Sequence, residues 1–538
     1  MSAMQWNFPN VWELVAERLP DAPAQAHGDR TVSWRDVDRR ADGVAQFLLD
    51  AGLRHQDKVA QHLYNGPEYL ESVFAAFKAG LVPVNSNYRY LEDELAYLWD
   101  NSDAAAVVFH GALADTTGKV RPRLPAVKAW LWVDDGSGPC PDWATPYEVA
   151  ATTPAPARVH GPWGRSPDDL FLLYTGGTTG FPKGAMWRQE DLFLAANRTQ
   201  KLRYPLDASE AEAAALLTQP GPVHLPASPL MHGLGSITSF QAMSSGGCVV
   251  TLTSRRFDPI ELLDTVQRRH VTNIAIVGDA IAKPILDALD EHPGRWDLSS
   301  LRMIASSGAM FSAPVKQGFL RHSDRLMLVD TLGSSESIGM ASSITNAAGG
   351  VDTARFRVSE DTAVITEDGR FVEPGSDEQG LLSRRGNYAL GYYKDEAKTD
   401  ATYRVVDGVR LVTPGDMARV EADGSIVLLG RGSACINSAG EKIFPEEVEE
   451  ALKQHPAVRD AAVVGVPDER LGEAVTAVVE PEAGDTPTDD ELIGFVKQKI
   501  ASYKAPKRVL LVPSIDRLVT GKNDYKRWKA YAAETRLP

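Results

Sequence analysis

The sequence predicts an α/β protein with a large N-terminal domain of mixed and parallel sheets with helices, and a small α+β C-terminal domain. Short apolar runs typical of buried strands alternate with stretches of helical periodicity over most of the chain, which favours a largely parallel sheet. The 538 residues are too many for one compact core. Length therefore predicts two or three domains, and we divide the chain into residues 1–431 and residues 432–538.

The first elements of the N-terminal domain alternate between helix and strand. Ser33 and Asp36 form a helix-opening capping box, and apolar residues recur at helical spacing after it. Residues 134–161 are rich in Pro, Ala, Asp and Gly, so we expect a loop there. The other elements expected early in the chain are helices over 10–19 and 67–80, a strand from Asp57, and strands over 82–85 and 104–109.

Predicted strands and helices continue to alternate after residue 161, and the tail is predicted to form the small α+β domain. Asp258 precedes Pro259 at the start of a predicted helix, which is a usual N-terminal signature. In the tail, Pro445 opens a helix, and Thr488 with Glu491 forms a second capping box. The strands expected after residue 161 cover 170–173, 271–277, 301–305, 326–329 and 461–466, with further alternation over 475–479.

Composition excludes several classes of partner. The net charge of −16 disfavours nucleic acid or an anionic membrane as the main partner. The three cysteines have no metal-ligand spacing and cannot all pair, which fits a reducing cytoplasm. We find no signal peptide and no apolar run long enough to span a membrane. The assembly state stays open, with a homodimer as one option.

One glycine- and threonine-rich stretch dominates the search for function. It runs from Tyr174 to Gly184 with the sequence YTGGTTGFPKG, directly after the strand predicted over 170–173. Glycines let the backbone approach a ligand closely, and backbone N–H groups, hydroxyls and one ammonium can together surround a phosphate. The spacing is neither that of a Walker loop nor GxGxxG. The stretch therefore predicts a phosphate-binding loop of another kind.

This stretch resembles the phosphate loop of the adenylate-forming superfamily, which includes acyl-CoA synthetases, luciferases and the adenylation domains of peptide synthetases. The usual pattern is YTSGTTGxPKG, and the sequence departs from it at Gly176, where that pattern has serine. The resemblance extends from about Val11 to Tyr525. It implies that the loop holds the phosphates of ATP through Thr175, Gly176, Gly177, Thr178, Thr179 and Lys183.

Two further strings resemble the nucleotide site of the superfamily. Ser307, Gly308 and Ala309 resemble the turn whose backbone faces adenine. The string from Asp330 to Glu336 resembles the motif NxYGxTE. The resemblance implies that Asp330 accepts from the adenine amino group, Leu332 replaces the aromatic residue on the adenine face, and Glu336 holds Mg²⁺ and is catalytic. The other nucleotide contacts implied in this string are Thr331, Gly333, Ser334 and Ser335, with Ser335 on the α-phosphate.

A shorter motif resembles the part of the superfamily that forms the acyl pocket. Pro229 to Gly235 resembles LPxFHxxG, which assigns His232 to catalysis and, with Gly233, to the pocket that receives the carboxylic acid. A core histidine with a satisfied ring is the alternative for His232. Gly278 either widens this pocket or forms a tight turn between a strand and a helix. Met340 is also assigned to the pocket.

The remaining motifs lie around the predicted hinge and in the tail. Thr413 to Asp416 resembles the TGD motif, which implies that Asp416 accepts from the ribose hydroxyls. The string around Arg431 resembles the hinge GRxxDxI, with Ala434 where the superfamily has Asp or Lys. Arg431 would contact ribose or phosphate, and Gly440 would line the CoA tunnel. Near the end, Lys522 matches the catalytic lysine that neutralises charge during adenylation.

The resemblance implies a ligase that uses ATP, Mg²⁺ and CoA to activate a small-molecule carboxylic acid, with a mobile C-terminal domain. The strings YTGGTTGFPKGAMWR, GSSE and GYYKDE look like the subgroup that activates bulky steroid or terpenoid acids. Three hypotheses stay open. The first is the full acyl-CoA synthetase. The second is an enzyme that only converts a supplied acyl-adenylate to the thioester, since Gly176, Leu332 and Ala434 depart from the usual pattern. The third is a non-catalytic acyl or nucleotide sensor.

Overall fold

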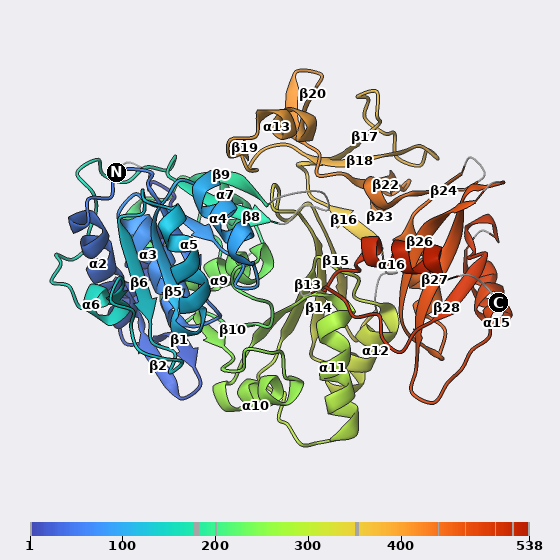
Figure 1. Ribbon diagram of the computed structural model, residues 1–538, viewed down its shortest axis with the longest axis horizontal. Coiled ribbons are helices and arrows are strands. Elements are labelled where there is room, and N and C mark those ends of the chain that lie inside the picture. The colour runs from blue at the N-terminus through green and yellow to red at the C-terminus, as the bar shows by residue number, and fades with distance from the viewer. Residues whose placement is uncertain are drawn as a thin grey trace.

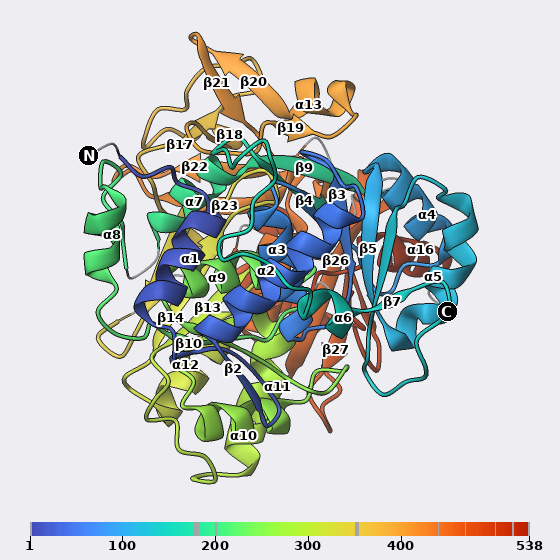
Figure 2. The same cartoon turned by 90° about the vertical axis from the view of Figure 1, so that its left-hand side faces the viewer.

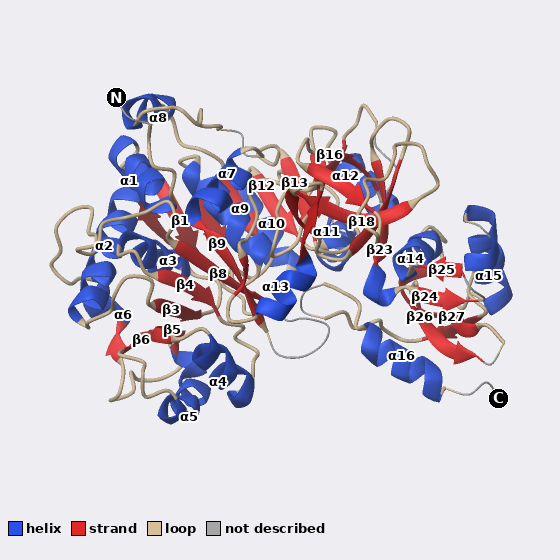
Figure 3. Cartoon of the chain, turned by 90° about the horizontal axis from the view of Figure 1, so that it is seen from above, coloured by secondary structure: helices blue, strands red, loops and turns tan. Residues whose placement is uncertain are grey.

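The computed structural model describes residues 3–175, 182–199, 202–349, 354–438, 441–468, 470–500, 502–518 and 521–535. Within these ranges the strands form three sheets, two in the large N-terminal part and one in the C-terminal part (Figure 1). The predicted fold class is confirmed. Figure 3 shows the C-terminal part as a separate layer of strands and helices beside the larger one. No helix of the described residues is both long and apolar enough to cross a bilayer.

The first sheet has eight strands, and its central strands are parallel. Side chains alternate across it, so Val59 packs with the helices of one face and Ala60 with those of the other. One face is covered by α1 (Phe8–Arg18), α2 (Trp34–Asp50), α3 (Pro67–Lys78) and α9 (Gly233–Ser244), and the other by α4 (Glu92–Asn101) and α5 (Ala114–Val120), as Figure 2 helps to follow. The strands in spatial order are β19 (Gly391–Tyr392), β9 (Lys183–Arg188), β8 (Leu170–Thr175), β4 (Val82–Asn85), β3 (Lys58–His62), β5 (Ala104–His110), β6 (Ala129–Val133) and β7 (Thr145–Pro146).

The second sheet is parallel from β1 through β14 and antiparallel beyond β14. Its parallel half is covered by α10 (Pro259–Arg269), α11 (Gly278–Glu291) and α12 (Ala313–His322). Its strands in spatial order are β2 (Arg30–Ser33), β1 (Pro23–His27), β11 (Cys248–Thr251), β10 (Val223–Pro226), β12 (Asn273–Ile276), β13 (Met303–Ser307), β14 (Met327–Leu332), β15 (Ala341–Thr345), β16 (Arg355–Val358), β23 (Ile426–Arg431), β22 (Asp416–Val420), β18 (Gln379–Arg384), β21 (Val409–Val412) and β20 (Tyr403–Val406), with β17 (Thr362–Ile365) beside β18.

The third sheet forms the C-terminal part together with three helices. Val463 packs under α14 (Pro445–Lys453) and α15 (Asp489–Lys499), whereas its neighbour Val464 packs against α16 (Tyr525–Glu534) on the opposite face. Val475, Ala477 and Val479 of the next strand share the core of Val463, whereas Val478 shares that of Val464, so the alternation expected over 475–479 is confirmed. The strands are β25 (Glu441–Ile443), β24 (Ile436–Ser438), β27 (Gly472–Pro481), β26 (Val458–Asp468) and β28 (Arg508–Leu511).

Helix starts that depend on local chemistry agree with the sequence. The Ser33 side chain accepts from the Asp36 N–H at the start of α2. At the start of α10, the Asp258 side chain accepts from the N–H groups of Ile260 and Glu261. Thr488 and Glu491 form the reciprocal capping box of α15. Each of these hydrogen bonds joins residues at most three apart, so the local sequence is enough to predict these helix starts. The large domain also contains the helices α7 (Gln189–Asn197), α8 (Glu210–Leu216) and α13 (Glu396–Thr402).

The loop expected over residues 134–161 is wrong in its middle. That segment contains β7 and the short helix α6 (Tyr147–Ala151). The Tyr147 ring is fully buried, and Glu148 pairs with Arg40 of α2 at 2.8 Å. These partners lie more than a hundred residues away, so long-range packing rather than local composition forms this helix.

Candidate active site

Five of the predicted site segments lie at the carboxyl ends of parallel strands. Thr175 is the last residue of β8, Ser307 ends β13 and Leu332 ends β14. The turn that leads to His232 follows β10, and Gly278 follows β12. Ligands of open parallel sheets bind outside the carboxyl ends of their strands. The topology therefore gathers residues that are far apart in the sequence at one edge of each sheet.

Side-chain hydrogen bonds join the ends of β13 and β14. The Ser307 hydroxyl donates to the Thr331 carbonyl at 2.8 Å, and the Thr331 hydroxyl donates to the Ser306 carbonyl at 3.1 Å. Gly308 follows with φ of +84°, a conformation that side chains disfavour, and only Val277 lies within 4 Å of the position a Cβ would take. Together with Ala309, this turn leaves its backbone accessible to a flat ligand.

Asp330 lies in the same strand but already has a partner. Its carboxylate pairs with the ammonium of Lys316 of α12, and both side chains are almost fully buried. Burial raises the pKa of Asp330 to about 6, although Lys316 opposes that effect. The motif predicts Asp330 as an acceptor for adenine, but no motif predicts Lys316 as its ion-pair partner.

Glu336 is held by a tyrosine from a distant segment. The Tyr392 hydroxyl donates to Glu336 Oε1 at 2.5 Å, and Glu336 accepts a further bond through its carbonyl from the Ala389 N–H. The Ser334 hydroxyl accepts from the Glu336 N–H, and the Ser335 carbonyl accepts from the Trp187 indole at 2.7 Å. A Cβ on Gly333 would lie 3.1 Å from the Ser337 carbonyl oxygen. The turn that carries the carboxylate is therefore fixed at several points.

The same distant segment also holds the lysine of the phosphate loop. Lys183 begins β9, opposite Thr175 of β8, and its ammonium pairs with Asp395 at 2.5 Å. Tyr392 and Asp395 are three residues apart, so residues 391–395 link Glu336 to Lys183. Gly176, Gly177, Thr178 and Thr179 lie outside the described residues.

His232 stands at the start of α9 with its ring largely buried. Its Nε2 atom is buried and has no hydrogen-bond partner within the described part of the chain. Burial, followed by the positive charges of Lys522 and Arg89, lowers the pKa of His232 to about 4, so the ring is neutral at pH 7. A satisfied core histidine would have partners for both nitrogens, and the described residues supply none for Nε2.

The loop that carries Lys522 lies directly against the large domain. Gly521 has φ of +73°, and a Cβ on it would lie 2.5 Å from Val277 Cγ1. Lys522 itself is exposed, and its carbonyl accepts from the Leu518 N–H at 2.9 Å. A cavity of about 200 Å³ lies between this loop and the large domain, bordered by Ala227, Ser228, Pro229, Val277, Ala280, Ile281, Arg517, Leu518 and Gly521.

The remaining predicted site residues are Gly278, Gly233, Met340, Asp416, Arg431 and Gly440. Gly278 has φ of +49°, and a Cβ on it would lie 2.2 Å from the Met310 carbonyl oxygen, as expected for the tight-turn alternative. Gly233 is the first residue of α9 and contacts Leu173. Met340 is buried in a core cluster that Leu332 borders. Asp416 pairs through its backbone with Arg431, whose side chain, like all of Gly440, lies outside the described part.

Asn85, which the sequence analysis did not predict as a site residue, connects two of these segments by hydrogen bonds. Asn85, at the end of β4, is buried and donates to the carbonyls of Tyr174 at 2.7 Å and Met231 at 2.6 Å. Its amide oxygen accepts from the Tyr174 N–H at 2.6 Å. Asn85 therefore fixes the entry to the glycine–threonine loop and the residue before His232. The segment over 82–85 was expected as a strand and turn, but nothing in its sequence signals these partners.

We expect Asn85→Ala to lower the free energy of unfolding by about 2–3 kcal/mol, because buried backbone groups of Tyr174 and Met231 lose their partners. Chemical denaturation with intrinsic fluorescence measures this change. Asn87→Ala is the matched control, since the described contacts of the Asn87 side chain, with the Arg89 N–H and with Tyr90, are local. Equal stability of the two variants would contradict the role given to Asn85.

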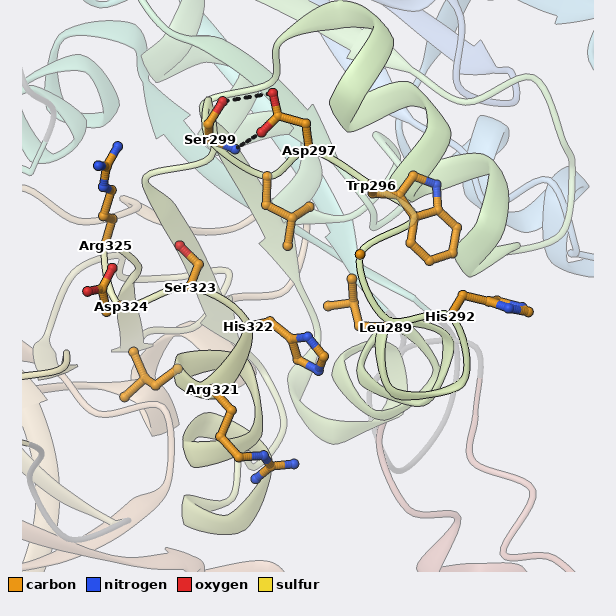
Figure 4. Close-up of a pocket in the computed structure, with 13 residues that line it drawn as sticks. Leu289, His292, Trp296, Asp297, Ser299, Arg321, His322, Ser323, Asp324 and Arg325 are labelled. Atoms are coloured by element: carbon orange, nitrogen blue, oxygen red, sulfur yellow. Dashed lines mark hydrogen bonds between the residues drawn. The ribbon is translucent and has the colours of Figure 1, made fainter.

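A second cavity lies elsewhere and contains none of the predicted residues. It measures about 630 Å³ and lies at the far ends of α11 and α12 (Figure 4). Trp296, His322 and Arg325 are among its lining residues, and Asp297 bonds to Ser299 at its rim. No orphaned buried polar atom of the described residues belongs to this cavity.

Comparison with known proteins decides the family. The family described as AMP-binding enzyme matches residues 12–393, and the AMP-binding enzyme C-terminal domain matches residues 447–522. The chain belongs to the AMP-binding enzyme family. The resemblance to the adenylate-forming superfamily that the motifs carry is thereby confirmed.

Relatives of this AMP-binding enzyme match over nearly its whole length. A medium/long-chain-fatty-acid–CoA/3-oxocholest-4-en-26-oate–CoA ligase of Mycolicibacterium smegmatis is 40% identical, covering 99% of this chain and 97% of the relative. A 3-oxocholest-4-en-26-oate–CoA ligase of Rhodococcus rhodochrous is 41% identical, covering 98% and 95%. The likeness to the steroid-acid subgroup is confirmed by these names.

Solved structures share the fold of this AMP-binding enzyme. The anthranilate CoA ligase AuaEII in complex with anthranoyl-AMP matches with a TM-score of 0.81 at 22% identity, covering 98% of this chain and 97% of that one. ATP-bound MatB from Rhodopseudomonas palustris matches with a TM-score of 0.78 at 22% identity, covering 97% and 99%. These likenesses establish the arrangement of a large and a small domain.

Proposed function

We propose that this AMP-binding enzyme is an ATP-dependent, AMP-forming carboxylic acid–CoA ligase that activates a bulky hydrophobic acid, such as a steroid side-chain acid or a long acyl chain. The observation that carries the proposal is the position of the lysine loop. Gly521 packs on Val277, and the charge of Lys522 contributes to the low pKa of His232. The names of the relatives support the class of acid.

The first half-reaction forms an acyl-adenylate. A carboxylate oxygen of the acid attacks the α-phosphorus of ATP, the bond to the β-phosphate breaks, and pyrophosphate leaves. The enzyme needs no nucleophile of its own, so its contribution is orientation and charge neutralisation. We assign Lys522 to the negative charge that develops between the carboxylate and the α-phosphate, and the neutral His232 ring to the acid beside it.

The phosphates of ATP would displace one contact seen in the structure. Lys183 pairs with Asp395, and a bound phosphate offers the same ammonium more negative charge than one carboxylate does. Thr175, Ser335 and the rest of the glycine–threonine loop would supply the remaining donors. Asp416 would accept from the ribose hydroxyls, and the turn at Gly308 would face adenine.

Mg²⁺ fits at Glu336. A Mg²⁺ ion in a nucleotide site commonly takes one or two carboxylates and completes its shell with phosphate oxygens and water. No cluster of three metal-ligating side chains occurs among the described residues, so the protein alone would not bind the ion tightly. Glu336 presents one carboxylate whose Oε1 is oriented by Tyr392. When bound, the ion supplies positive charge to the phosphates.

The second half-reaction releases AMP. The sulfur of CoA attacks the acyl carbon, the acyl–phosphate bond breaks, and the thiol proton is lost. We propose that the small domain turns about the boundary between Arg431 and Gly432 for this step and withdraws Lys522. In support, β23 ends at Arg431 in the second sheet, and the next strand, β24, belongs to the third.

Product analysis tests the proposal. The enzyme is incubated with ATP, Mg²⁺, CoA and each of a set of steroid, terpenoid, fatty and short-chain acids, and acyl-CoA is measured by mass spectrometry. We expect acyl-CoA from the bulky or long acids and none from acetate. Thioester formed only from a supplied acyl-adenylate would favour the enzyme limited to that step, and binding without any product would favour a sensor.

A further inference from the structure

The small domain contacts the large domain through a buried ion pair outside the motifs. Asp279, in the first turn of α11, lies 3.2 Å from the ammonium of Lys453, the last residue of α14. Both side chains are at most 3% exposed. The second oxygen of Asp279 accepts from the Ser312 N–H at 2.9 Å, so the carboxylate is held rigidly within the large domain.

The pair continues through the small domain to the catalytic loop. The ammonium of Lys453 is also 3.7 Å from Asp460 of β26, which forms a two-point ion pair with Arg517 at 2.6 Å. Arg517 then donates to the carbonyl of Gly521 at 3.0 Å. Gly521 is the residue immediately before Lys522. Asp279, Lys453, Asp460 and Arg517 together are here called the charge chain.

The charge chain is balanced in charge; Asp279 and Lys453 are buried, and Asp460 and Arg517 are at most 16% exposed. It contains two carboxylates and two cations. Against the opposing effect of burial, Lys453 and Arg517 hold the pKa of Asp460 well below its usual range. The buried carboxyl of Glu449 and the ammonium of Lys283, which bonds to the Arg459 carbonyl, also face it. Removing one partner of such a buried pair leaves an uncompensated charge, which is strongly unfavourable.

The two ends of the charge chain, Asp279 and Arg517, meet the same part of the large domain. Asp279 is two residues after Val277, which is the residue that Gly521 packs against. The charge chain thus closes a loop of contacts from α11 through the small domain and back to Val277, just before α11. All of these contacts are made in the orientation of the small domain seen in this structure.

We infer that Asp279 and Lys453 are positioning residues for adenylation, because the charge chain docks the small domain so that Lys522 reaches the reacting carboxylate and α-phosphate. The inference rests on the proposed function. A contact made in one of two domain orientations favours that orientation by its differential free energy and does nothing for the other. Loss of the pair should therefore slow the step that needs this orientation and spare the step that does not.

The two half-reactions are measured separately in Lys453→Met and Asp279→Asn. Methionine keeps much of the apolar stem of Lys453, and asparagine keeps the acceptor for the Ser312 N–H. We expect acid-dependent exchange between ATP and labelled pyrophosphate to fall by about tenfold or more in each variant. Conversion of synthetic acyl-adenylate and CoA to acyl-CoA should be unchanged or faster. The double variant should lose less than the product of the two single losses.

Asp287→Asn is the matched control, because Asp287 of α11 also pairs across the domains, with Arg459 of β26 at 2.7 Å, but both side chains are more than a third exposed. Its exchange rate should stay within about twofold of the parent enzyme. The inference is overturned if both half-reactions fall in parallel, if neither changes, or if Asp287→Asn matches Lys453→Met. A parent enzyme that shows no exchange would instead overturn the proposed function.

Discussion

Replacing Lys522 by alanine is expected to lower the rate of acyl-adenylate formation by about 10²–10³-fold, the usual effect of removing one group that stabilises transition-state charge. Lys522 is exposed, and its loop lies against Val277 beside the His232 turn, so truncation removes an ammonium without opening a core. The free energy of unfolding should stay nearly constant. Acid-dependent pyrophosphate release measures the loss.

The same variant should keep the second half-reaction. Synthetic acyl-adenylate and CoA should give acyl-CoA within about twofold of the parent rate, because no group of Lys522 is assigned to thiol attack. Lys526→Ala is the control, since Lys526 lies four residues further on in α16 and is exposed. A loss of both half-reactions, or a loss of pyrophosphate release in Lys526→Ala, would contradict the role of Lys522.

Glu336→Gln is the second change with a large expected effect. Glutamine keeps an oxygen that can accept from Tyr392 but removes the negative charge. We expect adenylation to slow by about 100-fold and the Mg²⁺ concentration for half-maximal rate to rise, because a neutral oxygen is a poorer ligand for a hard cation. Titration of pyrophosphate release with Mg²⁺ at saturating ATP measures both effects.

Two neighbouring tyrosines provide the comparison for Glu336. Tyr392→Phe removes the hydroxyl that orients the carboxylate and should cost about tenfold in the same titration, as expected for a group that orients a metal ligand. Tyr393→Phe removes a hydroxyl that bonds to Asp103 near the surface, and it should leave the titration unchanged. Similar titrations for the two tyrosine variants would show that Tyr392 does not act through Glu336.

What could be predicted from the sequence is what local chemistry determines. The cap at Ser33 and the capping box at Thr488 each depend on residues three positions apart, and both form as expected. Apolar alternation likewise identified β27, where Val475, Ala477 and Val479 pack on one face and Val478 packs on the other. The family followed from long motifs, since the string around Tyr174 leaves few alternatives.

What could not be predicted depends on contacts between distant residues. Lys183 and its partner Asp395 are 212 residues apart, and Asn85 reaches Met231 across 146. Lys316 pairs with Asp330 only because α12 packs beside β14. No pattern in one sequence shows which charges meet across domains. The charge chain through Lys453 is of this kind, because every member lies outside a recognisable motif.

The central claim is that this enzyme forms an acyl-adenylate with the lysine loop docked as seen here. Isotope exchange between ATP and labelled pyrophosphate, without CoA and with a steroid side-chain acid, tests it most directly. We expect label to enter ATP only when the acid is present, and acyl-CoA to appear when CoA is then added. Label that stays in pyrophosphate for every acid, while synthetic acyl-adenylate and CoA still give acyl-CoA, would contradict the account.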